Sequence, residues 1–213
     1  MAELQFFTGT MDSGKSTLAL QTNHNHAVRG RVGRIFTTHD RAGESILSSR
    51  LGLQHDAIEV RAGFDFWRYV VDTLTQGGRI DYLICDEAQF YSVAQVEQMA
   101  DLVDRSSVDV YAFGLATDFR SELFPGTKRL FELADELLRL QVEVLCWCGR
   151  PGQMNARVAG GAVVREGDQV VVADTDHDEL EVRYQVLCRH HYREGDLGPA
   201  AVGAGQLRLP DRA

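Results

Sequence analysis

Apolar strand-like runs alternate with helical segments along the first two thirds of the chain. Runs of the buried-strand type lie at residues 4–8, 32–37, 82–85 and 108–114. Helices are expected between and after them, at residues 15–28, 64–74, 93–103 and 130–138. In the second and third of these helices, apolar residues recur at the spacing of one helix face. The alternation predicts an α/β fold, a mostly parallel sheet with helices on both faces.

The pattern changes after about residue 140. Short β-type runs follow at residues 142–145, 162–164 and 170–172, separated by turns rich in Gly and Asp. From Glu194 onward the chain is rich in Gly, Ala and Pro and shows no periodicity, which favours disorder. We therefore expect a nucleotide-binding domain over residues 1–140, a small lobe over residues 141–193 and a disordered tail over residues 194–213.

Composition excludes several classes of protein. The chain has 213 residues, 44% hydrophobic and 25% charged, which is typical of a globular protein. Acidic residues outnumber basic ones by 31 to 22, so the net charge is −9 and a basic surface for nucleic acid is not expected. There is neither an 18-residue apolar window nor a basic segment before an apolar one at the N-terminus. These features predict a soluble cytoplasmic protein without a membrane partner.

A phosphate-binding loop follows the first predicted strand. The motif G-x-x-x-x-G-K-[ST] is matched by Gly9, Thr10, Met11, Asp12, Ser13, Gly14, Lys15 and Ser16. Its place between a strand and a helix is the context that the motif requires, because backbone N–H groups there turn toward phosphates. Lys15 would neutralise phosphate charge and the Ser16 hydroxyl would bind Mg²⁺. The alternative is a chance Gly-rich turn, which this context disfavours.

Two adjacent carboxylates, Asp86 and Glu87, end the apolar run at residues 82–85. Ligands of α/β proteins bind at this end of a strand. Neighbouring strand residues point to opposite faces, so we expect different roles for the two acids. Asp86 suits the magnesium shell and Glu87 suits a general base. The alternative is an ordinary acidic turn; Cys85 is most simply a small buried hydrophobic residue.

The remaining cysteines lie in the small lobe. Cys146 and Cys148 form one close pair, and Cys188 is followed by His190 and His191. Two pairs of soft ligands favour a closed structural Zn²⁺ site, which would stabilise a lobe too small for its own core. Both histidines compete for the fourth position, with C-x-x-H spacing favouring His191. Unliganded thiols are the alternative.

These motifs, in this order, resemble type II thymidine kinases. The resemblance rests on M-D-S-G-K-S-T after the first strand, D-E-A-Q-F at residues 86–90, G-L-A-T-D-F-R at residues 114–120 and C-R-H-H-Y at residues 188–192. It runs from about residue 4 to residue 192. It implies a P-loop (RecA-like) kinase fold with a C-terminal zinc-binding lobe.

The resemblance also implies residue roles. Glu87 would take the proton of the nucleoside 5′-hydroxyl, and ATP would contact the phosphate loop and a second strip made of Asp86, Glu87, Ala88 and Gln89. Thymidine would contact Met11, Phe119, Tyr184 and a lasso-like segment of Gln169, Val170, Val171, Val172 and Ala173. Zinc would bind Cys146, Cys148, Cys188 and His191. Ala173-Asp174 stands where the family often has Gly-Gly, and residues 174–181 are longer and more acidic than the family pattern. A lone Phe after a strand is otherwise usually a core residue.

The function expected from these features is transfer of phosphate from Mg²⁺-ATP to thymidine, with deoxyuridine as a possible acceptor, in pyrimidine salvage for DNA synthesis. The family resemblance further implies a homotetramer inhibited by thymidine triphosphate. One alternative is a single-domain ATPase stimulated by nucleic acid, since D-E-A-Q also resembles the acidic motif of helicases. Another is a nucleotide-sensing protein whose zinc lobe binds a partner.

Overall fold

The computed structural model describes residues 1–38, 46–169 and 182–199, which form two compact units. The large unit combines residues 1–117 with residues 123–142. The small unit combines residues 118–122 with the chain from residue 143 onward. The short segment 118–122 therefore belongs with a part of the chain that follows it by more than twenty residues.

A six-stranded sheet forms the centre of the large unit, and every pair of neighbouring strands in it is parallel. Its order is β5-β2-β6-β7-β1-β8. The strands are β1 (Leu4–Thr8), β2 (Gly33–Thr37), β5 (Ile58–Glu59), β6 (Tyr82–Cys85), β7 (Asp109–Gly114) and β8 (Glu136–Arg139). The predicted α/β class is confirmed. The carboxyl ends of β1 and β6, with β7 between them, lie at one edge of the sheet.

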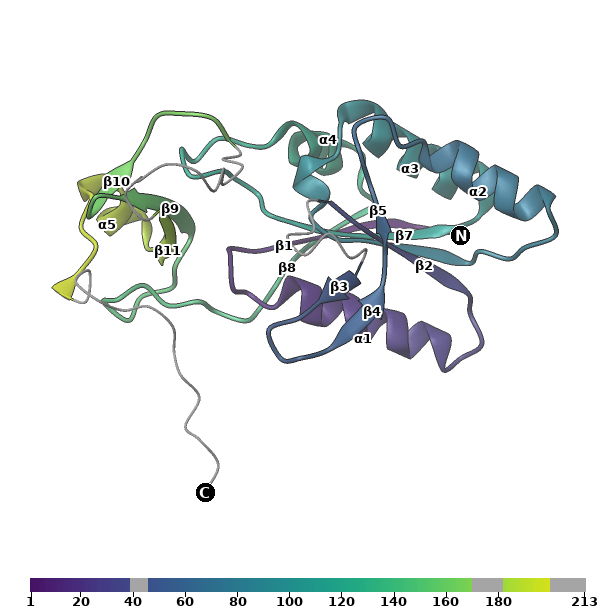
Figure 1. The fold of residues 1–213 in the computed structure, drawn as a ribbon, viewed down its shortest axis with the longest axis horizontal. Coiled ribbons are helices and arrows are strands. Elements are labelled where there is room, and N and C mark those ends of the chain that lie inside the picture. The colour runs from purple at the N-terminus through teal and green to yellow at the C-terminus, as the bar shows by residue number, and fades with distance from the viewer. Residues whose placement is uncertain (39–45, 170–181, 200–213) are drawn as a thin grey trace, which may run out of the picture. The chain divides into compact units, whose positions relative to one another are not determined.

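Helices cover both faces of this sheet, as predicted (Figure 1). One face carries α1 and the hairpin β3–β4, and the other carries α2, α3 and α4. The elements are α1 (Lys15–Ala27), β3 (Ile46–Ser48), β4 (Gln54–Asp56), α2 (Phe66–Thr75), the 3-10 turn η1 (Ala88–Phe90), α3 (Val93–Ser106) and α4 (Pro125–Leu133). The hairpin and β5 were not predicted, because runs of two or three residues carry too little periodicity.

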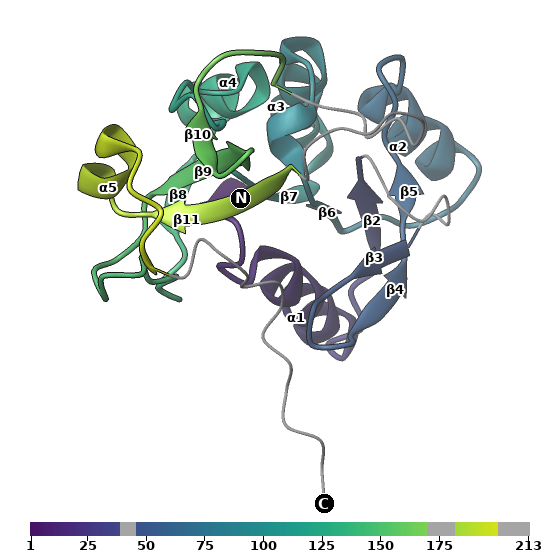
Figure 2. The same cartoon turned by 60° about the vertical axis from the view of Figure 1, so that its left-hand side comes forward.

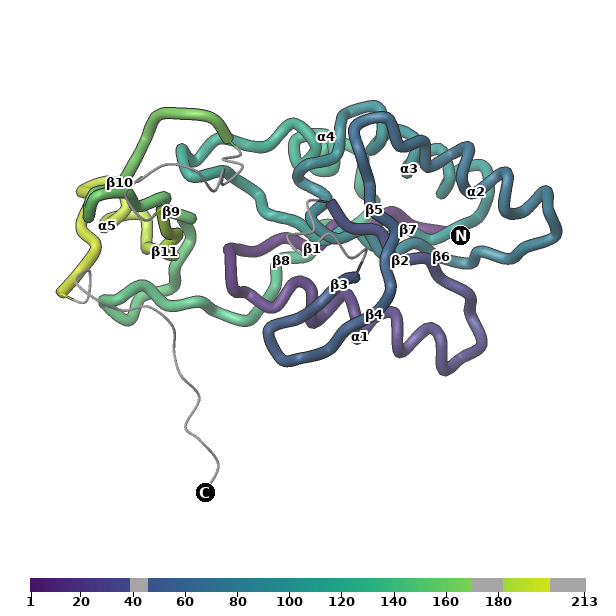
Figure 3. Tube along the Cα trace, viewed as in Figure 1, coloured from purple at the N-terminus to yellow at the C-terminus, as the bar shows by residue number. Residues whose placement is uncertain are grey.

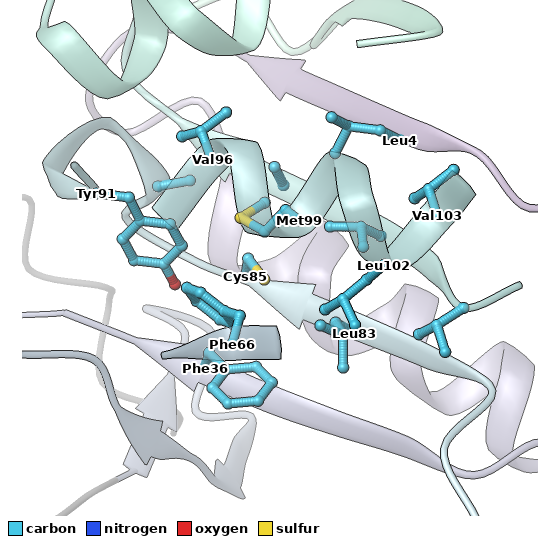
Figure 4. Packing of buried hydrophobic residues seen from close by; sticks show 14 of the residues in the cluster. Leu4, Phe36, Phe66, Leu83, Cys85, Tyr91, Val96, Met99, Leu102 and Val103 are labelled. Atoms are coloured by element: carbon cyan, nitrogen blue, oxygen red, sulfur yellow. The ribbon is translucent and has the colours of Figure 1, made fainter. Parts of the chain in front are cut away.

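The central strand β6 contributes to a core on each side of the sheet. Leu83 and Cys85 join the core under α2 and α3, where they pack with residues such as Met99 (Figure 4). Tyr82 and Ile84 join the core under α1. All four β6 side chains are fully buried, because a parallel strand between two helix layers has no solvent-facing side. Cys85 is a buried hydrophobic residue here, as expected.

Local sequence sets where α2 and α3 begin. The Asp65 side chain accepts a hydrogen bond from the Arg68 N–H and caps α2. Ser92 and Gln95 form a reciprocal capping box at the start of α3. Such caps satisfy N–H groups that have no partner within the helix. Both helices occur where the apolar spacing predicts them.

The helix predicted over residues 130–138 is wrong in its bounds. Helix α4 begins earlier, at Pro125, and ends at Leu133, and residues 136–139 form the edge strand β8 beside β1. At the boundary, the Asp135 side chain accepts from the Leu4 N–H, and the Asp135 N–H donates to the Leu4 carbonyl. Pairing with β1 therefore outweighs a local pattern that fits either a helix or a strand.

The small unit contains an antiparallel sheet of order β10-β9-β11, with β9 in the middle (Figure 2). Its elements are β9 (Met154–Ala159), β10 (Ala162–Val164), β11 (Arg183–Leu187) and α5 (Arg189–Glu194). The strand expected at residues 142–145 is wrong, because only Leu145 forms a bridge, to Pro151. The run at residues 170–172 lies outside the described residues.

A compact apolar cluster holds the small unit together. It includes Cys146, Leu187, Cys188, Tyr192 and Leu197, all at most 6% exposed. Two of these residues, Cys146 and Cys188, are also predicted metal ligands, so the predicted metal site forms part of this core. The cluster extends past Glu194 to Leu197, whereas the sequence pattern favours disorder from Glu194 onward. Among the described residues, no helix is long and apolar enough to cross a membrane.

Candidate functional site

The phosphate loop connects β1 to α1, and the chain path through it can be followed in Figure 3. Gly14 has a left-handed backbone (φ 81°) immediately before α1, a conformation that glycine adopts without strain. A Cβ atom on Gly9 would lie 2.4 Å from the Ser13 Oγ, so a side chain at this position would displace Ser13. No side chain caps the start of α1. Its first N–H groups therefore stay available to an anion.

Lys15 lies folded onto this loop. Its Nζ donates to the Thr10 carbonyl at 2.7 Å, and the residue is 8% exposed. Burial lowers the pKa of Lys15, while the nearby carboxylates Glu87 and Asp86 oppose that shift. A cation held among these acids is suited to neutralising the charge of a bound phosphate.

The Ser16 hydroxyl connects the loop to the acidic turn after β6. It donates to the Asp86 Oδ2 at 2.7 Å. Asp86 is 1% exposed, and its Oδ1 is buried without a hydrogen-bond partner among the described residues. Burial, together with the charge of Glu87, raises the pKa of Asp86 to about 6, although the Ser16 hydroxyl acts in the opposite direction.

This pair of residues fits a divalent cation. A hydroxyl and a carboxylate are hard oxygen donors of the kind that Mg²⁺ binds, directly or through water. The unpartnered Asp86 Oδ1 would gain an interaction that the protein itself does not provide. The residues present thus match the predicted Mg²⁺-nucleotide chemistry.

Glu87 and Asp86 differ in their surroundings, but not for the predicted reason. Strand β6 ends at Cys85, so alternation along a strand no longer applies to the two acids. Glu87 instead has a left-handed backbone (φ 52°) and starts the turn η1. Asp86 is buried, whereas Glu87 is half-buried. The acids do have different environments, and a strained turn produces them.

The other residues expected near the nucleotide have varied surroundings. Ala88 is fully buried, and the Gln89 side chain is buried with both ends of its amide hydrogen-bonded. Met11 is half-buried in the turn of the loop. Asp12 is exposed, has φ 63° and forms an ion pair of 2.6 Å with Arg50 from the β3–β4 hairpin.

The predicted metal ligands of the small unit lie together. The ligand atoms of Cys146, Cys148, Cys188 and His191 are all within 4.8 Å of one another. The His191 Nδ1 is 3.4 Å from the Cys146 Sγ, while His190 is exposed and pairs with Glu194. The structure therefore favours His191 over His190. Three thiols and one imidazole at this separation form a donor set typical of a structural zinc site.

Trp147, between two of these cysteines, packs against the fourth ligand. Its ring stacks on His191 with centroids 4.3 Å apart, and its Nε1 donates to the Asp196 carbonyl. A hydrogen bond from the backbone N–H of His191 is the main cause that lowers the pKa of the Cys188 thiol. A lower thiol pKa favours the thiolate that metals bind.

Segment 118–122 is held within the small unit by Asp118. Asp118 is 3% exposed and accepts hydrogen bonds from the backbone N–H groups of Arg120 and Glu122 and from the Gln169 side chain. Burial alone would raise the pKa of Asp118, but these hydrogen bonds and the Arg120 guanidinium lower it. Asp118 is therefore a charged anchor for the predicted base-stacking residue beside it.

Phe119 is 2% exposed and packs on the guanidinium of Arg157. The Arg157 Nε donates to the Tyr184 hydroxyl at 3.0 Å, and its Nη2 donates to the Gln169 carbonyl at 3.1 Å. Three of the predicted thymidine contacts, Phe119, Gln169 and Tyr184, thus share one arginine. The remaining lasso positions, Val170, Val171, Val172 and Ala173, lie outside the described residues.

Sequence reasoning included Asp118 and Tyr192 only as motif residues without a role, and it missed Arg157. The Tyr192 hydroxyl donates to the Phe119 carbonyl at 2.6 Å. Arg157 did carry a signal. It is the one charged residue of strand β9 and is the register partner of Tyr184 on β11. A buried charge in a strand needs specific partners. No local signal indicated the role of Tyr192.

The parallel sheet, the uncapped phosphate loop and the Ser16–Asp86 pair define a P-loop nucleotide-binding protein built for phosphoryl transfer. The sequence matches the family model described as thymidine kinase over residues 2–192. The chain belongs to the thymidine kinase family.

Individual relatives agree with this assignment. A thymidine kinase of Streptomyces coelicolor is 60% identical over 193 residues, which cover 91% of this chain and 89% of the relative. One of Streptomyces avermitilis is 54% identical, covering 96% and 94% of the two chains. One of Cutibacterium acnes is also 54% identical, covering 93% and 91%.

Proposed function

We propose that this protein transfers the γ-phosphoryl group of Mg²⁺-ATP to the 5′-hydroxyl of thymidine, giving thymidine monophosphate and ADP. Family membership supports the substrates. The observation that carries the chemistry is the buried, unpartnered Asp86 Oδ1 beside the Ser16 hydroxyl, next to an uncapped helix start. These are the parts that phosphoryl transfer requires.

The phosphate loop binds the triphosphate. Its backbone N–H groups and the start of α1 surround the phosphate oxygens, and Lys15 neutralises part of their charge. Ser16 and Asp86 would hold Mg²⁺, which would neutralise negative charge on the phosphates. Lys15 must leave the Thr10 carbonyl to reach a phosphate, and a bound anion compensates for that lost hydrogen bond.

Glu87 acts as the general base. Its carboxylate accepts the proton of the thymidine 5′-hydroxyl as the oxygen forms its bond to the γ-phosphorus. The bond between that phosphorus and the β,γ-bridging oxygen breaks, and ADP leaves. Glu87 is half-buried, and its charge influences the pKa of Lys15 and of Asp86. This electrostatic coupling supports placing Glu87 beside the transferred phosphate.

The base-binding role falls to Met11, Phe119, Tyr184 and the lasso segment from Gln169 to Ala173. Phe119 would stack against the base as the family resemblance implies, and its loop is held by Asp118 and Tyr192. Backbone groups of the lasso, which lies beyond Gln169 outside the described residues, would supply hydrogen bonds to the pyrimidine edge, as the family resemblance implies. Zn²⁺ would be held by Cys146, Cys148, Cys188 and His191 and would be structural, because four protein ligands leave no open position for catalysis.

Two finer features are proposed on family resemblance. Thymidine triphosphate, which combines the base of one substrate with a phosphate chain like that of the other, would act as a feedback inhibitor. The active enzyme would be a homotetramer. Size-exclusion chromatography with light scattering, and inhibition by thymidine triphosphate against both substrates, test these two points separately.

The function is tested by phosphate transfer from labelled ATP with Mg²⁺. Thymidine is compared with deoxyuridine, deoxycytidine, deoxyadenosine, deoxyguanosine and single-stranded DNA. We expect labelled monophosphate with thymidine, a smaller yield with deoxyuridine and none with the other acceptors. ATP hydrolysis that rises with DNA, without a nucleoside monophosphate, would instead identify a nucleic-acid-stimulated ATPase. Nucleotide binding without turnover on any acceptor would identify a sensor.

A further inference from the structure

The Gln89 side chain connects the proposed base to the end of a central strand. Its Nε2 donates to the Glu87 Oε2 at 2.5 Å, and its Oε1 accepts from the Leu115 N–H at 3.0 Å. Gln89 is 1% exposed. Both ends of the amide are therefore used inside the protein, and its side chain is closed to a nucleotide.

The backbone around Gln89 is packed so tightly that the amide has little freedom to move. A Cβ atom on Gly114 would lie 2.8 Å from the Gln89 Oε1 and 3.1 Å from its backbone N. A Cβ atom on Gly126, in the first turn of α4, would lie 3.0 Å from the Gln89 carbonyl. Two neighbouring glycines thus allow β7 and α4 to approach the turn η1 closely.

Glu87 needs such a constraint. Its backbone is left-handed, which an L-residue adopts only at a cost, and its side chain is half-buried rather than enclosed. A free glutamate side chain samples many rotamers, and a displacement of about 1 Å at a reacting group can cost on the order of 100-fold in rate. A single donated hydrogen bond to one carboxylate oxygen orients the other oxygen.

We infer that Gln89 is a positioning residue for Glu87: it holds Oε2 by its amide N–H and leaves Oε1 to accept the proton of the acceptor hydroxyl. The rigid reference for this orientation is the Leu115 N–H at the end of β7. The inference rests on the proposed role of Glu87. It assigns Gln89 to the base, whereas the family pattern places it in the nucleotide strip.

The test is a double-mutant cycle between Gln89 and Glu87, measured as the single-turnover rate of thymidine phosphorylation at saturating substrates. Gln89→Met keeps the length of the side chain and removes both hydrogen bonds. We expect the rate to fall about 10- to 100-fold in the wild-type background, with the KM for ATP within twofold of wild type. In the Glu87→Gln background, adding Gln89→Met lowers the rate no further, because Gln89 acts only through the base.

Other outcomes have defined meanings. A similar loss of rate on adding Gln89→Met to Glu87→Gln, or a rise confined to the KM for ATP, would overturn the inference in favour of a structural or nucleotide-binding role. If Glu87→Gln is inactive and Gln89→Met is normal, the inference alone fails. If Glu87→Gln keeps the wild-type rate, the proposed function of Glu87 fails.

Two further variants guard against a folding effect. Gly114→Ala retains the glutamine, but the added Cβ atom would lie 2.8 Å from the Gln89 Oε1 and would displace the amide. We expect this variant to lower the rate only when Glu87 is present. Gln76→Met lies at the exposed end of α2 and leaves the rate unchanged. Thermal unfolding is recorded for each variant, so that only folded protein enters the cycle.

Discussion

The guanidinium carbon of Arg157 lies 3.6 Å from the centre of the Phe119 ring, in contact with one face of it. Both residues are buried, although 38 positions separate them in the chain. The same guanidinium donates hydrogen bonds to Tyr184 and Gln169. One buried cation thus sets the plane of the ring and the positions of two other proposed thymidine contacts.

Replacing this cation tests that organisation. Arg157→Lys keeps the charge but loses the planar stack and one of the two hydrogen bonds. We expect the KM for thymidine to rise about 10-fold, with the KM for ATP unchanged. The measurement is steady-state kinetics with each substrate varied in turn. Arg68→Lys, at an exposed position of α2, is the matched control. An unchanged thymidine KM would show that the three contacts are placed without Arg157.

The pKa of Asp86 predicts a dependence of stability on pH. The folded carboxyl has a pKa of about 6, above the ordinary value of 3.8, mainly because it is buried. Protonated Asp86 therefore favours folding below about pH 4, and this contribution is lost as the pH rises through 6. The loss is on the order of 3 kcal/mol.

Asp86→Asn isolates this effect, because the amide resembles the protonated acid. Without divalent cations, we expect the variant to be more stable than wild type at pH 8, and the difference to shrink toward pH 4. Urea unfolding from pH 4 to pH 8 measures it. Added Mg²⁺ should stabilise wild type at pH 8 and leave the variant unchanged. A stability difference that is constant with pH would contradict this prediction.

Removal of zinc should act on the small unit. Cys146 and Cys188 belong both to the ligand cluster and to the core, so losing the metal unfolds that core. Cys188→Ser should lose bound zinc and thymidine binding while the large unit still binds ATP. Metal analysis and separate titrations of the two ligands check this. Cys85→Ala, in the core of the large unit, should retain one zinc per chain; loss of zinc from this control would rule out the assigned ligand set.

Gly198 should matter to the metal site, although it follows Glu194. It has φ 77°, and a Cβ atom there would lie 2.5 Å from the Trp147 ring, which stacks on His191. Gly198→Ala should weaken zinc binding about 10- to 100-fold, as changes next to metal ligands do. Gly195→Ala has a similar φ with open space around it and controls for backbone strain. Competition with a chromogenic chelator measures both, and equal effects would dismiss the role of Trp147.

Local sequence was sufficient for many elements because short-range physics decides them. The continuous apolar run of β6 favours a buried strand, and in the structure it has no solvent-facing side. Asp65 and the Ser92–Gln95 pair cap helices from within their own first turn. The glycines of the phosphate loop permit a turn that other residues would strain, by a left-handed backbone at Gly14 and by a close approach to Ser13 at Gly9. In each case the partners are a few residues apart.

Other features depended on partners far along the chain. The local pattern of residues 136–139 fits a helix, yet these residues form a strand because they pair with β1 at the edge of the sheet. Asp118 and Phe119 lie in sequence between two parts of the large unit but contact Gln169, Arg157 and Tyr192, which belong with them to the small unit. No periodicity indicates such contacts, because they depend on which surfaces meet after the chain has folded.

By itself, the sequence determined the fold class, the phosphate loop, the acidic pair and the types of metal ligand, since each is a local pattern whose chemistry requires those residues. Only the tertiary structure decided how they are oriented. It placed Gln89 between Glu87 and the Leu115 N–H, left the Asp86 Oδ1 without a partner among the described residues and brought the ligand atoms of Cys146, Cys148, Cys188 and His191 together. Orientation requires hydrogen-bond partners from separate elements, and only packing brings those elements together.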